Sequence, residues 1–226
     1  RMLDIGFFDD IVKIIGQLPK KRQSLMFSAT MADKIRKLAN QILNNPLEVS
    51  VAVSKPAEGV TQEVYMAHED QKNRMVKHLL KDKDLFQAIL IFCSTKKKVE
   101  QLSRQLKRSN YNAEGISSDY AQKEREETLA GFRSGRTRIL VATDVMSRGI
   151  DIKGIDLVIN YDVPTDAEDY VHRIGRTARA KSKGMAITFI CQEDMYRFVR
   201  IEELIERKLD KKHPPEHIGN GPEWDA

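Results

Sequence analysis

Four short apolar runs separated by helical patterns are the feature of this sequence that most restricts its fold. Each run has the length of a buried strand, and the runs cover residues 88–93, 138–143, 156–161 and 185–191. Weaker strand patterns occur at 62–67 and 113–116, and helical patterns lie at 70–81, 96–108, 121–133, 166–174 and 194–209. Strands that alternate with helices pair in parallel and have helices on both faces. The sequence therefore predicts a doubly wound, mainly parallel α/β sheet over residues 61–209.

The first 53 residues predict a smaller, partial α/β segment. Apolar residues between positions 8 and 15 have helical spacing, and a second helix is expected at 32–43. Buried strands are expected at 24–27 and 47–53. A short polar stretch at 54–60, with one proline and one glycine, predicts a linker to the larger domain.

The chain after position 209 is rich in proline and glycine, so residues 210–226 are expected to be a loosely ordered tail. The predicted organisation is therefore a partial segment at 1–53, a linker at 54–60, a domain at 61–209 and this tail.

Charge and cysteine content restrict the partners and the compartment. The net charge is +5 and the pI is about 9.1, which favours a polyanionic partner. Cys93 and Cys191 lie in apolar runs without metal-ligand spacing, so we expect buried thiols of a reducing compartment, the cytoplasm, and no metal site. No apolar run approaches the ~18 residues of a membrane span, so no membrane partner is expected.

Residues 172–179, His-Arg-Ile-Gly-Arg-Thr-Ala-Arg, contain three arginines spaced three apart. On a continuous helix, Arg173, Arg176 and Arg179 would share one face. Guanidinium groups on one stripe repel each other unless an anion lies in front of them, and a polyphosphate suits them because they bind its oxygens bidentately. The alternative is a solvated basic helix face.

A second motif decides between these interpretations. Residues 142–151 read A-T-D-V-x-x-R-G-I-D, and together with residues 172–179 they strongly resemble motifs five and six of the DEAD-box RNA helicases. Ser28-Ala29-Thr30 resembles motif three of the same family, and residues 122–125 match its Q-x-x-R element. The resemblance extends to about residue 209. One departure is Ala178, where the family commonly has glycine.

The resemblance implies a nucleotide site and an RNA site. Arg176 and Arg179 would be arginine fingers that reach the γ-phosphate of ATP, and Asp151 would bind the ATP ribose; its alternative role is that of an exposed loop acid. The residues implied for binding the RNA backbone are Thr95, Gln122, Arg125, Thr143 and Gly149. Taken alone, Q-x-x-R is common on surface helices.

The resemblance also implies residues that couple the two sites. These interdomain coupling residues would be Ser28, Thr30, Asp144, Arg148, His172 and Arg173. His172 and Arg173 would contact motif three across the cleft between two RecA-like domains, and Arg148 with Asp144 would belong to the same network.

The sequence lacks a G-x-x-x-x-G-K-[ST] phosphate loop and a D-E-A-D quartet. We therefore expect the ligands of ATP and Mg²⁺ to lie in a preceding part of the first RecA-like domain, which would also be a partner of this chain. The chain alone is expected to have no ATPase activity. Two other functions stay open: a superfamily-two DNA motor, and a non-catalytic module that binds RNA or protein.

The partial segment at 1–53 lacks the neighbouring strands that its own strands would need. Apolar side chains of Ile14, Leu25, Phe27 and Leu38 would then have no partners. We expect this segment to self-associate with another copy or to pack against the missing part of its domain.

Overall fold

The computed structural model describes residues 7–27, 33–49, 59–81, 86–144, 154–177 and 184–226. The chain divides into two compact units, Arg1–Ser54 and Lys55–Ala226. The division falls at the start of the expected linker, most of which lies outside the described residues. No helix in the described ranges is long and apolar enough to span a membrane.

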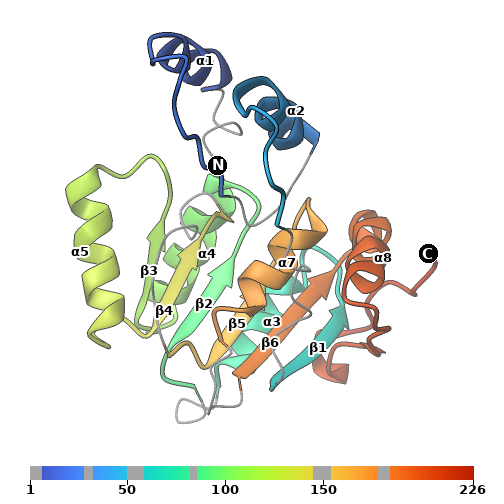
Figure 1. Cartoon of the computed structure of the whole chain (residues 1–226). Helices are drawn as coiled ribbons and strands as arrows, with labels where there is room; N and C mark the ends of the chain where they lie inside the picture. Colours follow the sequence, from blue (N-terminus) through green and yellow to red (C-terminus); the bar gives the residue numbers. More distant parts are fainter. Residues whose placement is uncertain (1–6, 28–32, 50–58, 82–85, 145–153, 178–183) are drawn as a thin grey trace. The chain divides into compact units, whose positions relative to one another are not determined.

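The described part of the second unit is built on a seven-stranded sheet in the order β3-β4-β2-β5-β6-β1-β7 (Figure 1). All pairings are parallel, which confirms the predicted fold class. The strands are β1 (Val60–Met66), β2 (Ile89–Phe92), β3 (Ala113–Ile116), β4 (Ile139–Ala142), β5 (Leu157–Asn160), β6 (Gly184–Ile190) and β7 (Lys211–Lys212). The apolar runs of the sequence become β2, β4, β5 and β6.

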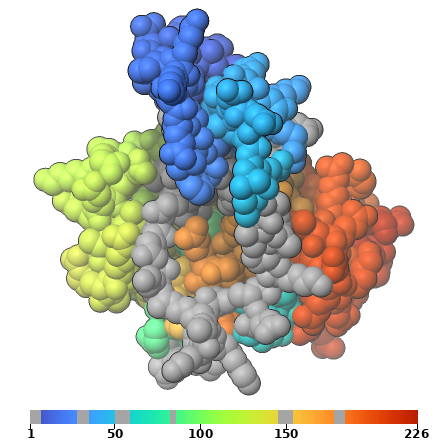
Figure 2. Space-filling model, in the orientation of Figure 1, coloured from blue at the N-terminus to red at the C-terminus, as the bar shows by residue number. Residues whose placement is uncertain are grey.

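Helices cover both faces of this sheet (Figure 1). They are α3 (Lys72–Leu79), α4 (Lys96–Arg108), α5 (Gln122–Arg133), α7 (Ala167–Ile174) and α8 (Met195–Leu204), with short 3₁₀ turns η1 (Gln192–Asp194) and η2 (Glu216–Ile218). Figure 2 shows α5 in yellow-green and α8 with the red C-terminal residues on opposite sides of this unit.

Alternate residues of the central strands enter different apolar cores. Ile89 and Ile91 of β2 pack with residues of α3 and α4, whereas Leu90 and Phe92 pack on the other face, with Phe132 of α5. Every residue of β2, β4 and β5 is buried, because helices cover the sheet on both sides. This two-sided burial is why the strands read as continuous apolar runs. Both cysteines are buried free thiols, as expected.

The expectation of a loosely ordered tail at 210–226 is wrong. Lys211–Lys212 forms β7 and pairs with β1, Ile218 is buried, and the ring of Trp224 lies edge-on to Phe198, 6.3 Å between centroids. Gln71 Nε2 donates to the carbonyl oxygens of residues 218, 219 and 220 at 3.4, 3.2 and 3.0 Å. The tail is ordered because its few apolar side chains and its backbone carbonyls have partners on the domain.

The first unit contains helices α1 (Phe8–Gly16) and α2 (Asp33–Ile42). The strand expected at 24–27 is not formed, and residues 47–49 of the expected second strand are not in a strand either. Leu25 and Phe27 are 72% and 89% exposed, and Ile14 is also exposed, as expected for side chains without partners. Leu38 differs, because it is buried. A strand needs a paired neighbour for its backbone groups, and the described part of this unit supplies none.

Candidate functional site

The residues that follow parallel strands gather at one edge of the sheet. Ser94 and Thr95 follow β2, Thr143 and Asp144 follow β4, and Asp162 follows β5 by two residues. These three strands are neighbours, in the order β4-β2-β5. In open parallel sheets, ligands bind beyond the carboxyl ends of the strands, so this edge is the candidate site.

Arg173 of α7 links two of these strand ends. Its Nε and Nη2 donate to Oδ1 and Oδ2 of Asp144, each at 2.6 Å. Its Nη1 donates to Asn160 Oδ1 at 3.1 Å and to the carbonyl oxygen of Asp162 at 2.8 Å. The guanidinium carbon lies 4.9 Å from the ring centre of Phe92, and the residue is only 3% exposed. These contacts occupy each guanidinium nitrogen, so Arg173 fixes the positions of β4, β5 and α7 relative to one another.

Arg173 and Arg176 therefore do not share one exposed helix face. The helix ends at Ile174, and Arg176 lies in the following turn, where its amide donates to the carbonyl of Arg173 at 3.1 Å. Arg176 is partly exposed, whereas Arg173 is buried among polar partners. Spacing alone could not predict this difference, because it assumed that the helix continues.

Among the expected coupling residues, the structure brings Asp144 and Arg173 together within the second unit. His172 is partly exposed, with Nδ1 3.8 Å from Asp169 Oδ1. Ser28, Thr30 and Arg148 lie outside the described residues, as do the candidate ligand-binding residues Gly149, Asp151 and Arg179.

The candidate RNA-binding residues lie on three elements of the second unit. Thr95 caps the N-terminus of α4, where its hydroxyl accepts from the Lys98 amide at 3.2 Å. Thr143 is buried at the end of β4. Gln122 and Arg125 lie in the first turns of α5, where Gln122 Nε2 donates to Glu126 at 2.7 Å. Arg125 Nε is buried, and no hydrogen-bond partner for it occurs among the described residues.

A cavity of about 540 Å³ lies between the N-terminal ends of α4 and α5. Its lining is mostly charged, with one aromatic, one apolar and one hydroxyl side chain: Lys96, Lys97, Val99, Glu100, Ser117, Asp119, Tyr120 and Glu124. Lys96 and Asp119 form an ion pair there. Residues that line the cavity are close in sequence to Thr95 and Gln122. The cavity therefore lies at the same edge of the domain as these two candidate RNA-binding residues.

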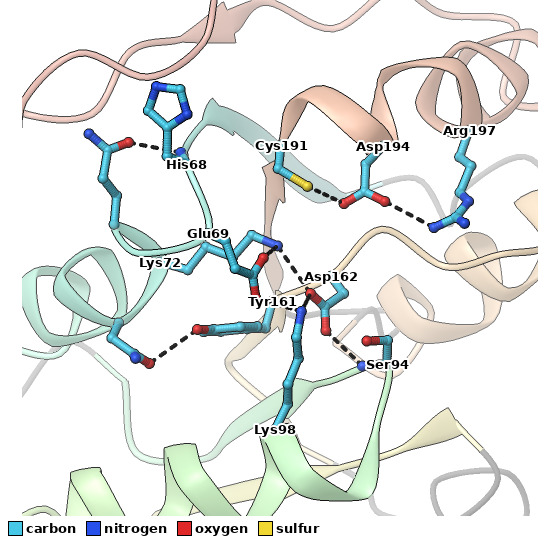
Figure 3. Close-up of polar contacts among 12 residues, drawn as sticks. His68, Glu69, Lys72, Ser94, Lys98, Tyr161, Asp162, Cys191, Asp194 and Arg197 are labelled. Atoms are coloured by element: carbon cyan, nitrogen blue, oxygen red, sulfur yellow. Dashed lines mark hydrogen bonds and ion pairs between the residues drawn. The ribbon is translucent and has the colours of Figure 1, made fainter.

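Asp162 is at the centre of a second polar network (Figure 3). Its Oδ1 lies 3.0 Å from Lys72 Nζ and 2.6 Å from Lys98 Nζ, and its Oδ2 accepts from the Ser94 amide at 2.8 Å. Glu69 pairs with the same two lysines at 2.7 and 2.5 Å. Burial raises the pKa of the Asp162 carboxyl, but the two lysines and the Ser94 amide outweigh burial and hold the pKa at about 2.

Comparison with known proteins identifies the family. The helicase conserved C-terminal domain family matches residues 71–181. DEAD-box ATP-dependent RNA helicase 40 of Oryza sativa subsp. japonica is 46% identical over 199 residues, which cover 86% of this chain and 25% of that protein. The C-terminal domain of the DEAD-box protein Dbp5 is 30% identical with a TM-score of 0.61, and the match covers 68% of this chain and 90% of that structure. This chain belongs to the DEAD-box helicase family.

Other DEAD-box proteins extend the match beyond the C-terminal domain. DEAD-box ATP-dependent RNA helicase CshA of Geobacillus kaustophilus is 40% identical over 95% of this chain and 46% of its own length. The structure of S. cerevisiae Dbp5 bound to RNA and ADP BeF3 has a TM-score of 0.78 at 30% identity, with 92% of this chain and 55% of that one covered. This chain thus spans a quarter to under half of the two curated relatives named here.

The DEAD-box motifs point to the ends of β2 and β4 but give no role to the lysines and the glutamate around Asp162. Lys72 and Glu69 belong to no motif. Lys98 is the last of three consecutive lysines, a pattern that predicts the solvent-exposed start of a helix. The one available signal is an aspartate placed just after the apolar run 156–161. Its partners come from distant parts of the chain, so only the fold reveals them.

Proposed function

We propose that this chain is the C-terminal RecA-like half of an ATP-dependent RNA helicase. It binds the backbone of single-stranded RNA along the carboxyl edge of the sheet and supplies Arg176 and Arg179 to ATP held by the first RecA-like domain. The observation that carries this proposal is the two-point contact of Arg173 with Asp144. It joins the strand end of motif five to the helix that precedes Arg176 in motif six.

The RNA part of the proposal is supported by the kinds of groups at this edge. Thr95 and Thr143 lie at strand ends, where hydroxyl groups and backbone amides suit phosphate oxygens. Arg125 contributes a guanidinium at the start of α5, and the chain carries a net charge of +5. Contacts of this type neutralise phosphates without reading bases, so binding should depend strongly on salt and weakly on sequence.

The ATP part is supported by Arg176. Arg176 follows helix α7, which the contact of Arg173 with Asp144 holds in place. The backbone of Arg176 is therefore fixed relative to the end of β4. A guanidinium aimed at the charge that develops on the transferred phosphoryl group accelerates hydrolysis by about 10³–10⁵-fold. Arg179 would act beside it in the same motif.

The described carboxylates of this edge do not fit a magnesium site. Asp144 holds Arg173, and Asp162 holds Lys72 and Lys98, so both already bind cations. Mg²⁺ would instead be bound with ATP by the first RecA-like domain, the other partner of this chain.

We further propose that the first unit packs against another apolar surface, supplied by the rest of the first RecA-like domain or by a second copy of the chain. Leu25 and Phe27 are largely exposed, and each large side chain left in water forgoes about 1.5–3 kcal/mol. The chain should therefore sediment as a dimer at high concentration, and Phe27→Ser should shift it towards monomer. A chain that stays monomeric at every concentration would rule out the second copy.

The test of the function is RNA binding at several salt concentrations, with DNA of the same sequence as comparison. Arg125→Ala should weaken RNA binding about equally for different sequences and reduce the salt slope by about one. Arg133→Ala is the matched control, because Arg133 is an exposed arginine at the other end of α5. Equal binding of DNA would favour the DNA motor, and loss of binding in the control variant alone would contradict the assignment of Arg125.

A further inference from the structure

Asp162 contacts two functional elements through different parts of the same residue. Its side chain accepts from the Ser94 amide and binds Lys98, so it contacts both ends of the segment 94–98 that contains Thr95 (Figure 3). Its backbone carbonyl accepts from Arg173 Nη1 at 2.8 Å. Arg173 in turn binds Asp144, the residue after Thr143. One residue therefore connects the start of α4 with the arginine that binds Asp144 at the end of β4.

The ion pairs around Asp162 keep its carboxylate in a fixed place. The side chain of Lys72 is fully buried, and its ammonium lies between Asp162 and Glu69. Lys98 is bound by the same two carboxylates, and the Asp162 side chain itself is only 6% exposed. Two acids and two lysines balance in charge, so the network needs no external ion. Buried charged groups of this kind are costly to disrupt, which gives the segment 94–98 a fixed geometry.

We propose that Asp162 is a positioning residue for RNA binding. It holds the segment 94–98 at a fixed place relative to Arg173, so that Thr95 and Thr143 contact successive parts of one RNA backbone. This proposal rests on the proposed function and adds a residue that lies outside the helicase motifs used to assign it. Asp162 itself does not contact RNA. It acts through the Ser94 amide, Lys98 and Arg173.

A carboxylate is required at this position. An asparagine would keep an acceptor for the Ser94 amide but would lose the attraction to both lysines. Buried Lys72 would then depend on Glu69 alone, whose side chain is 51% exposed. Lys98 would lose one of its two carboxylate partners. The first turn of α4 would then no longer be held by an ion pair to the residue that follows β5.

Charge and position predict opposite effects of Asp162→Asn on RNA affinity. The substitution removes a negative charge, so simple electrostatic attraction to a polyanion would strengthen binding. If the segment 94–98 instead loses its fixed position, RNA binding should become weaker. We expect weakening of about tenfold, the size typical of one lost hydrogen bond to a charged group.

The matched control is Glu202→Gln. Glu202 is also a buried carboxylate, 2% exposed, that accepts from a backbone amide, Leu209 N at 2.6 Å, and binds a lysine, Lys211 Nζ at 2.5 Å. It belongs to α8 and the C-terminal residues, away from the candidate RNA-binding residues in the sequence. Both variants change the net charge by the same amount and both should lower Tm. Only Asp162→Asn should weaken RNA binding.

The experiment measures binding of a fluorescent single-stranded oligouridine RNA to the wild-type chain and the two variants, with Tm recorded for each. If wild type does not bind RNA, the proposed function fails. If wild type binds and folded Asp162→Asn binds equally or more tightly, or if Glu202→Gln weakens binding as much, the positioning role is overturned. If Asp162→Asn does not fold, Asp162→Glu takes its place, because it keeps the charge and displaces the carboxylate; unchanged RNA binding in that folded variant overturns the proposal.

Discussion

Arg173 and Asp144 form a two-point ion pair in which both guanidinium–carboxylate distances are 2.6 Å. The pair links α7 to Asp144, two residues after the end of β4, and Nη1 of the guanidinium donates to Asn160 and to the carbonyl of Asp162. An arginine in motif six thus stabilises the second unit internally, in addition to any contact it makes with another domain. Its loss should therefore affect stability as well as activity.

Arg173→Ala should lower the free energy of unfolding of the second unit by about 3–5 kcal/mol, because it leaves the Asp144 carboxylate and the Asn160 side chain without their buried partner. Arg173→Lys should cost less, since it keeps the charge but not the planar fork. Urea unfolding measures both. Arg197→Ala is the control: the Arg197 side chain is half-exposed where it pairs with the buried Asp194 at 3.0 Å, so its loss should cost less than the loss of the buried Arg173. Equal losses for Arg173→Ala and Arg197→Ala would contradict this account.

Gly221→Ala should release the C-terminal tail from the domain. A Cβ at this position would lie 1.8 Å from the carbonyl oxygen of Met66, and backbone atoms at the end of β1 have little room to move. Hydrogen exchange should then rise at residues 211–226, with loss of the Trp224 packing. Gly16→Ala provides a comparison, because a Cβ there meets no atom within 4 Å. Unchanged exchange in the Gly221→Ala protein would show that the tail adapts.

The acid limb of the stability curve should depend on Asp162. Its pKa is about 2 in the folded protein, below the ~3.9 of an unfolded aspartate, so the unfolded state takes up the proton first. The stabilisation is therefore complete above about pH 4 and is lost as pH falls towards 2, by about 2 kcal/mol in total. Urea unfolding of wild type and Asp162→Asn across this range measures it. The stability difference between them should shrink as pH falls, and a constant difference would contradict the prediction.

The sheet could be predicted because both of its faces are covered, so β2 and β4 are apolar along their whole length and β5 is apolar up to Asn160. The tail could not, because its order depends on Gln71 and Met66, which are far away in the sequence. Apolar residues alone predict strands near Leu25 and Leu47, but a strand also needs a pairing neighbour, and both side chains are exposed. Motif spacing located Arg173 without revealing that its partners lie within the same unit.

The central claim is tested most directly by the RNA-stimulated ATP turnover proposed for the full protein, measured with and without Arg176. Arg176→Ala should lower kcat by about 10³–10⁵-fold and leave the affinity for RNA unchanged, because this arginine is assigned to the transition state of phosphoryl transfer. Arg133→Ala, on α5, should leave both quantities unchanged. An Arg176→Ala enzyme that hydrolyses ATP at the wild-type rate would contradict the central claim that this chain supplies a catalytic arginine.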